Sequence, residues 1–372
     1  MNKNAIKTLI FLIKTKGQEC PPFHFNFTNE KKLLRIAKLN KATPVLFHFL
    51  KCPACQKKLN QKTLKELKCL EKQNLISHLI YQNRKKILNQ IFLKNKIGSV
   101  FIKDFSFYSQ MKLHQQFFWG TDLDITIHKN DFKKAKRLLL KKNYLITKSL
   151  NYEVTFIKPK MPIEIDLHFL ISETKQNELE FLNEKRIYQF SQELLEKSHL
   201  DQQGYYLPPK EYFLLSLIWH YSTNDVLRGL RNLNDIIEFT NHYGEEINWK
   251  KFLNLAKRFK LKNLSLFVIS LGSQIFSLPF PSGLKKTIKI PLKVRWLLPY
   301  FSPKKVALFP KGQFWNKSNE GKKLLRDHFF LQLIISENIP FYRLIRPKII
   351  IFLFQLYIFH FTKKVVFNKK TK

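Results

Sequence analysis

The sequence predicts an α+β fold in which a small mixed sheet is flanked by helical regions. Two observations predict it: apolar residues recur at helical spacing in residues 1–96 and 173–340, whereas residues 97–172 contain short segments in which apolar and polar residues alternate. The remaining residues, 341–372, are basic and apolar. We therefore expect an N-terminal helical region, an α/β core, a C-terminal helical domain and a tail.

Two apolar stripes predict helices in the first region. The stripes consist of Leu33, Leu34, Ile36, Ala37 and Leu39, and of Leu64, Leu67, Leu70, Leu75 and Leu79. The same region holds the four cysteines of the chain: Cys20, Cys52, Cys55 and Cys69. Because residues 1–16 lack the pattern of a secretory signal, we expect an intracellular protein with reduced thiols and no disulfide partner.

The close pair Cys52 and Cys55 leaves two alternatives to free thiols. One is a zinc site completed by Cys20 and Cys69, although a second close cysteine pair is missing. The other is a thioredoxin-like motif in which residues 44–49 would form the preceding strand. Nothing downstream supplies the rest of that fold, so we favour free thiols.

The middle region alternates between strands and one helix. Residues 96–103 are expected to form a buried strand, and Asn130 or Asp131 to open a helix with Phe132, Ala135, Leu138 and Leu139 on one face. Further strands are expected at residues 144–147, 152–158 and 163–169. These elements form a small α/β unit whose carboxylates are expected at one edge of the sheet.

Two of these strands carry acidic residues on one face. Asp122 and Asp124 alternate with apolar residues, and Glu164, Asp166 and His168 do the same about forty residues later. Adjacent carboxylates repel each other, so they are tolerated best around a hard cation, most often Mg²⁺. One such strand would fit chance alternation, but two in a chain this poor in acid predict a metal site.

The charge of the chain predicts a polyanionic partner. Lys and Arg number 66 against 27 Asp and Glu, which gives a formal net charge of +39. Such a charge attracts RNA, DNA or an anionic membrane. The lysines are scattered, so a generally basic surface remains the alternative.

The third region is expected to be helical at residues 212–221, 226–239, 249–259, 264–276 and 322–335. In the tail, residues 349–361 are nearly all apolar and have basic flanks, but they are too few to span a membrane. They would form a buried final helix or a helix lying on an anionic membrane surface. We expect a cytoplasmic protein, with peripheral attachment to the inner membrane as the alternative.

The ordered set of acidic strands resembles a known family. From about Leu33 to Ile335 the chain is similar to the bacterial uncharacterised nucleotidyltransferases, which share the fold of polymerase β. The likeness is sharpest at Gly120–Ile127, at Asn143-Tyr144 and at Ile163–Phe169, which matches the family's E-x-D-x-H strand. Residues 207–211, His220 and residues 230–236 give weaker support.

The resemblance implies a metal-dependent transfer of a nucleoside monophosphate from an NTP to an acceptor hydroxyl. Asp122 and Asp124 would hold two Mg²⁺ ions, with Mn²⁺ as the alternative, and Asp166 would complete the second metal site and orient or deprotonate the acceptor. The displacement would release pyrophosphate. RNA such as a tRNA end is the preferred acceptor because of the basic charge, although protein or small-molecule acceptors fit the motifs equally well.

Several other residues are candidates with open alternatives. Lys103, Gly120 and Thr121 are candidate nucleotide-binding residues, with a solvated lysine as the alternative for Lys103. Glu164 and His168 would either support Asp166 or bind the metal directly. The C-terminal helices supply a second group, which would contact the nucleotide or acceptor or else form a solvated or interhelical network: His220, Arg228, Arg231 and Asp235.

Two departures from the family pattern favour an alternative function. Lys103 is followed by Asp104 where family members usually have glycine, and Phe118 stands where the family has arginine. Either change would weaken the grip on a triphosphate. The alternative is a catalytically degenerate member that acts as an RNA- or membrane-binding module.

Overall fold

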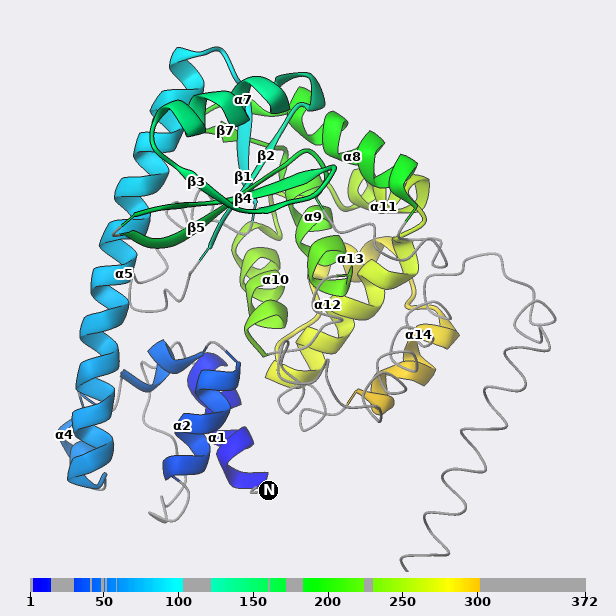
Figure 1. Cartoon of the computed structure of the whole chain (residues 1–372). Coiled ribbons are helices and arrows are strands. Elements are labelled where there is room, and N and C mark those ends of the chain that lie inside the picture. The colour runs from blue at the N-terminus through cyan, green and yellow to red at the C-terminus, as the bar shows by residue number, and fades with distance from the viewer. Residues whose placement is uncertain are drawn as a thin grey trace, which may run out of the picture. The chain divides into compact units, whose positions relative to one another are not determined.

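The computed structural model describes residues 3–14, 30–40, 42–47, 50, 52–57, 59–102, 122–159, 161–171, 183–223 and 230–301 (Figure 1). These residues belong to one compact unit, Met1–Ile335. They combine helices with a mixed five-stranded sheet, so the predicted α+β class is confirmed. The boundaries of the four regions stay a prediction, and the helix expected at 322–335 and the apolar run at 349–361 lie outside the described residues.

The first region is helical, as predicted. Its elements are α1 (Lys3–Lys14), α2 (Glu30–Leu39), the 3₁₀ helix η2 (Thr43–Phe47), α4 (Pro53–Gln56) and α5 (Gln61–Lys94). Residues 43–47 are all buried, and they form this 3₁₀ helix rather than the strand that a thioredoxin-like motif needs, so that alternative is wrong. Cys52 and Cys69 carry thiols rather than disulfides.

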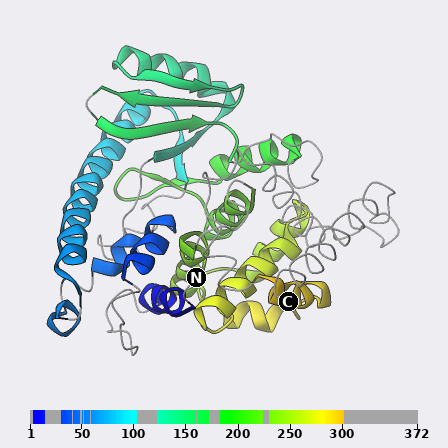
Figure 2. The same cartoon turned by 60° about the horizontal axis from the view of Figure 1, so that its bottom comes forward.

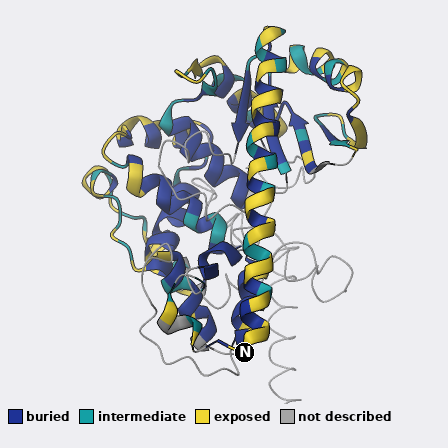
Figure 3. Cartoon of the chain, turned by 90° about the vertical axis from the view of Figure 1, so that its left-hand side faces the viewer, coloured by how far each residue is buried: buried dark blue, intermediate teal, exposed yellow. Residues whose placement is uncertain are grey.

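Only some of the leucines of the long helix α5 lie on its buried face. Leu64 and Leu67 are buried, but Leu75 and Leu79 are 54% and 61% exposed. Polar side chains such as Asn74 take the buried positions beside them. Figure 3 shows exposed positions along the whole length of this helix. Apolar spacing therefore predicts that α5 is a helix, but not which of its faces is buried.

The sheet has the order β1-β2-β5-β4-β3. Its strands are β1 (Ser99–Ile102), β2 (Asp122–Ile127), β3 (Leu145–Ser149), β4 (Glu153–Lys158) and β5 (Met161–His168). The pair β2–β5 is parallel and the other pairs are antiparallel. The two acid-bearing strands therefore lie in the middle of the sheet and not at its edge as expected, because β1 and β3 occupy the edges.

One face of the sheet is covered by α7 (Lys129–Lys141) and by the second half of α5. Ala135 and Leu139 of α7 are fully buried in the same cluster as Ile125, Ile165 and Phe92. Figure 2 shows α7 lying across the strands. The helix begins one or two residues earlier than expected, with His128 as a cap residue that makes no side-chain cap hydrogen bond.

The third region is also helical among the described residues. Its elements are α8 (Glu184–Glu196), the short strands β6 (His199–Leu200) and β7 (Tyr206–Leu207), α9 (Lys210–Thr223), α10 (Leu230–Tyr243), α11 (Trp249–Arg258), α12 (Lys262–Phe276), α13 (Ser282–Thr287), α14 (Leu292–Leu297) and the 3₁₀ helix η5 (Leu298–Tyr300). The predictions for α9, α11 and α12 are confirmed, whereas α8 was not predicted. Among the described residues, no helix is both long and apolar enough to cross a membrane.

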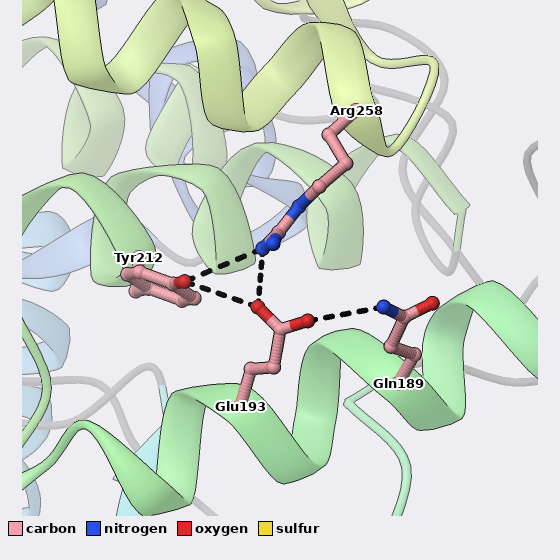
Figure 4. A network of polar contacts seen from close by, with 4 residues as sticks. All are labelled: Gln189, Glu193, Tyr212 and Arg258. Atoms are coloured by element: carbon pink, nitrogen blue, oxygen red, sulfur yellow. Dashed lines mark hydrogen bonds and ion pairs between the residues drawn. The ribbon is translucent and has the colours of Figure 1, made fainter.

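A polar network joins three of these helices (Figure 4). Glu193 of α8 accepts hydrogen bonds from Tyr212 of α9, at 3.1 Å, and from Gln189, at 3.1 Å, and it forms an ion pair with Arg258 of α11. Burial and the charge of Glu193 raise the pKa of Tyr212, so this hydroxyl stays a donor at neutral pH. The network fixes α8, which lies against β2.

Gly272 allows α12 to approach α10 closely. A Cβ at this position would overlap Cγ1 and Cδ1 of Ile237, a side chain that is 1% exposed.

We expect Gly272→Ala to cost about 1–3 kcal/mol of unfolding free energy, because overpacking outweighs the ~1 kcal/mol gain in helix propensity. Urea unfolding measures this cost. Gly98→Ala is the matched control, since a Cβ there meets only Tyr206 at 3.9 Å, and an equal effect of both substitutions would contradict the prediction.

Candidate metal centre

The register of two parallel strands brings three carboxylates together. Asp124 of β2 lies directly beside Asp166 of β5, and Asp122 lies beside Glu164. Residues in register on neighbouring strands point to the same face of a sheet. Asp122, Asp124 and Asp166 each offer an oxygen, and these atoms lie within 4.8 Å of one another. Among the described residues, no other group of three possible metal ligands is this close.

The alternating apolar residues hold this arrangement rigid. Leu123, Ile125, Ile165 and Leu167 are completely buried on the opposite face, in the core with α5 and α7. The carboxylate face instead turns toward the C-terminal helices, since its neighbour Ile102 belongs to their core. The three carboxylates are thus mounted on central strands, where a site is held more precisely than on loops.

Burial and the neighbouring carboxylates disfavour the ionised form of Asp166. The pKa of Asp166 is raised from 3.8 to about 7, mainly by burial and next by the charge of Asp124. Glu153 and Asp122 raise it further. Lys148 forms an ion pair with Glu153, at 2.6 Å. A bound cation would relieve this repulsion, since it favours the ionised form of every carboxyl group.

Thr155 is a site residue that the sequence analysis missed. It lies beside Asp166 on β4, and its hydroxyl donates a 2.6 Å hydrogen bond to Oδ1 of Asp166. The bond favours the ionised carboxylate and therefore opposes the other effects on the pKa of Asp166. The only signal in the sequence was the alternation of β4, which places Thr155 and Glu153 on its polar face.

Removing this hydroxyl is expected to raise the pKa of Asp166 above its value of about 7. Thr155→Val keeps the shape of the side chain and deletes the donor, so the carboxylate loses its stabilising hydrogen bond. Carbon-detected NMR titration of the Asp166 carboxyl group in EDTA measures the shift. Thr147→Val on the neighbouring strand is the control, because the Thr147 hydroxyl donates to the backbone oxygen of Thr155 instead. A lower or unchanged pKa in Thr155→Val would contradict the assignment.

Glu164 and His168 differ in their surroundings. Glu164 is exposed, and neither residue belongs to the group of three oxygens. His168 is 5% exposed, and its Nδ1 lies 3.2 Å from the hydroxyl of Thr126 and 2.5 Å from the carbonyl oxygen of Leu170. His168 therefore ties the end of β5 to β2, which favours a supporting role over metal binding.

The candidates on the C-terminal helices contact one another or the end of β5. Nδ1 of His220 donates to the carbonyl oxygen of Ile171, at 2.9 Å. Asp235 accepts a 2.7 Å hydrogen bond from Tyr221 and lies 3.8 Å from Arg231. These contacts support the interhelical network rather than nucleotide binding. Arg228 lies outside the described residues.

One comparison decides the family. The sequence model of a family described as "uncharacterised nucleotidyltransferase" matches residues 27–277, which is more than half of the chain. The chain belongs to this family. Membership of this family supports a general nucleotidyltransferase activity for the chain. The family also implies that an NTP is the substrate. No curated protein and no solved structure matches the chain.

The donor set of this nucleotidyltransferase fits a divalent ion. Three carboxylates are hard oxygen ligands of the type that Mg²⁺ and Mn²⁺ prefer, and a cation would offset the charge of Asp124, which contributes to the raised pKa of Asp166. The candidate nucleotide residues Lys103, Gly120 and Thr121 lie outside the described residues. The same holds for the two departures from the family pattern, at Asp104 and Phe118.

Proposed function

We propose that this nucleotidyltransferase moves a nucleoside monophosphate from an NTP to an acceptor hydroxyl at the carboxylate cluster. The observation that carries the proposal is the placement of three carboxylate oxygens within 4.8 Å of one another on adjacent parallel strands. A cluster of this charge would be costly as a structural feature. Its presence in a nucleotidyltransferase supports a role in binding metal-bound phosphates.

Asp122, Asp124 and Asp166 would hold the metal in this proposal. Two Mg²⁺ ions, with Mn²⁺ as the alternative, would supply charge neutralisation on the triphosphate and a lower pKa for the acceptor hydroxyl. Asp122 and Asp124 lie on one strand, β2, whose apolar residues are packed in the core, so the two carboxylates keep a fixed position relative to each other. We assign the nucleotide-binding role to Lys103, Gly120 and Thr121 on the strength of the resemblance alone.

Asp166 would be the group that receives or orients the acceptor. Thr155 occupies one lone pair of Oδ1, which fixes the carboxylate plane and leaves the other lone pairs to the ligands. With a cation bound beside it, Asp166 would be ionised and so able to accept a hydrogen bond from the acceptor hydroxyl. Glu164, exposed beside Asp122, would contribute negative charge without direct ligation.

The test of this function uses each labelled NTP in turn with Mg²⁺ and a total extract of RNA and protein. The intact chain is expected to label an acceptor, and Asp122→Ala/Asp124→Ala to leave it unlabelled. With the basic charge of the chain, we expect the label in the RNA fraction. Glu245→Ala, at an exposed position far along the sequence, is the matched control. Labelling that survives the double substitution would overturn the proposal.

A further inference from the structure

A basic groove is lined by residues of α2 and of the first turns of α5. Figure 1 shows that these turns lie at the end of α5 that is remote from the sheet. The groove has a volume of about 580 Å³. Its walls are formed by cationic, apolar and acidic side chains: Lys31, Leu34, Arg35, Lys38, Leu39 and Glu66. The groove therefore combines three positive charges with one negative charge.

Two contacts join α2 to the start of α5 beside the groove. The carboxylate of Glu30 accepts a hydrogen bond from the backbone N–H of Asn60, the cap residue of α5, at 3.3 Å. Lys38 of α2 donates to Glu66 of α5 at 2.6 Å. Glu30 is 4% exposed, so the first contact is anchored in the protein. The buried contact of Glu30 therefore holds α2 beside the start of α5.

The cations line one side of the groove at regular intervals. Lys31, Arg35 and Lys38 are spaced by four and three residues, so they share one face of α2. Their Cα atoms are spread over roughly 10 Å along the helix axis. Lys31 and Arg35 are exposed, and neither has a hydrogen bond or ion pair with another described residue. An anionic ligand would therefore find two uncompensated cations.

We propose that this groove binds the sugar–phosphate backbone of single-stranded RNA. A row of cations in an open groove suits a chain of phosphates better than one small anion, which would need convergent donors. The formal charge of +39 attracts such a polyanion over a long range. Glu66 lines the groove and is 42% exposed, so its carboxylate can accept a hydrogen bond from a ribose 2′-hydroxyl. DNA lacks this hydroxyl. The proposal is independent of catalysis at the carboxylate cluster.

The first test measures binding of a fluorescent single-stranded RNA to the full chain by anisotropy over a range of salt concentrations. For Lys31→Ala/Arg35→Ala, we expect at least a tenfold loss of affinity and a salt slope reduced by about 1.4, since each phosphate contact contributes about 0.7. Lys250→Ala/Lys257→Ala removes the same charge from exposed positions of α11 and is the matched control. An equal loss in both variants would overturn the proposal.

A second variant tests the groove without removing a cation. Glu66→Gln keeps a side-chain oxygen that can accept from the 2′-hydroxyl, but it deletes the negative charge and releases Lys38 from an ion pair that is exposed on both sides and contributes little stability. We expect RNA to bind several-fold more tightly, whereas Glu196→Gln, at an exposed position of α8, should bind as the unchanged chain does. Weaker or unchanged binding by Glu66→Gln would overturn the proposal.

Two further probes separate RNA from other polyanions. Single-stranded DNA of the same sequence should bind the intact chain more weakly than RNA, because it lacks the 2′-hydroxyl. Vesicles of anionic phospholipid should not compete with RNA for the groove. Groove-dependent binding that is as tight for DNA, or competition by vesicles that is lost in Lys31→Ala/Arg35→Ala, would overturn the assignment to RNA.

Discussion

Asp124→Asn is expected to reduce nucleotidyl transfer by about 10²–10⁴-fold while making the metal-free protein more stable. The substitution keeps the shape of the side chain but removes a charge that lies in register with Asp166. Activity is expected to fall because the proposed metal site loses a ligand. Stability rises because the charge of Asp124 is the largest electrostatic cause of the raised pKa of Asp166, after burial. Opposite signs for activity and stability are typical of a functional site.

Initial rates with saturating Mg²⁺ and NTP measure the first effect, and urea unfolding in EDTA measures the second. Glu245→Gln removes an exposed carboxylate and should change neither quantity. A variant of Asp124 that loses stability and activity together would show that this residue has a structural role. A variant that keeps both would show that the cluster is not the site.

The metal-free protein is expected to become less stable as the pH rises from about 4 to about 7. Asp166 holds its proton up to pH about 7 in the folded protein but only to about 3.8 in the unfolded chain. Between these values the folded state binds more protons than the unfolded state, so deprotonation favours unfolding. The shift corresponds to a loss of at most about 4 kcal/mol across this window.

Urea unfolding in EDTA at pH 5 and pH 8 measures this dependence. Asp166→Asn should remove it, because the amide does not titrate in this range. Mg²⁺ should stabilise the intact chain more at pH 8 than at pH 5, since the metal binds the ionised carboxylate. A pH dependence that is the same in the intact chain and in Asp166→Asn would contradict the pKa assignment.

The sequence predicts which strand faces carry the acidic residues, but it does not predict that these residues meet in the folded protein. Alternation predicts that Asp122 and Asp124 share a face and that Asp166 faces the same way on its own strand. It does not predict that β5 returns between β2 and β4, which is what places Asp166 beside Asp124. Strand order depends on tertiary packing, so the meeting of the three carboxylates required the structure.

Other features show the same limit. Thr155 could not be distinguished from any polar residue on an alternating strand until its hydroxyl was seen beside Asp166. In α5, polar Asn74 lies on the buried line while Leu75 is exposed, so apolar spacing misplaces the buried face. The helix α8 was predictable, because Ile187, Phe190 and Leu194 recur at helical spacing and are all buried.

The most direct test of the proposed chemistry compares NTP labelled at the α phosphorus with NTP labelled at the γ phosphorus. Transfer of a nucleoside monophosphate predicts that the acceptor fraction gains the α label and not the γ label, that pyrophosphate is released, and that both signals disappear in Asp122→Ala/Asp124→Ala. Gain of the γ label, or an α label that persists in this double variant, would contradict nucleotidyl transfer at the carboxylate cluster.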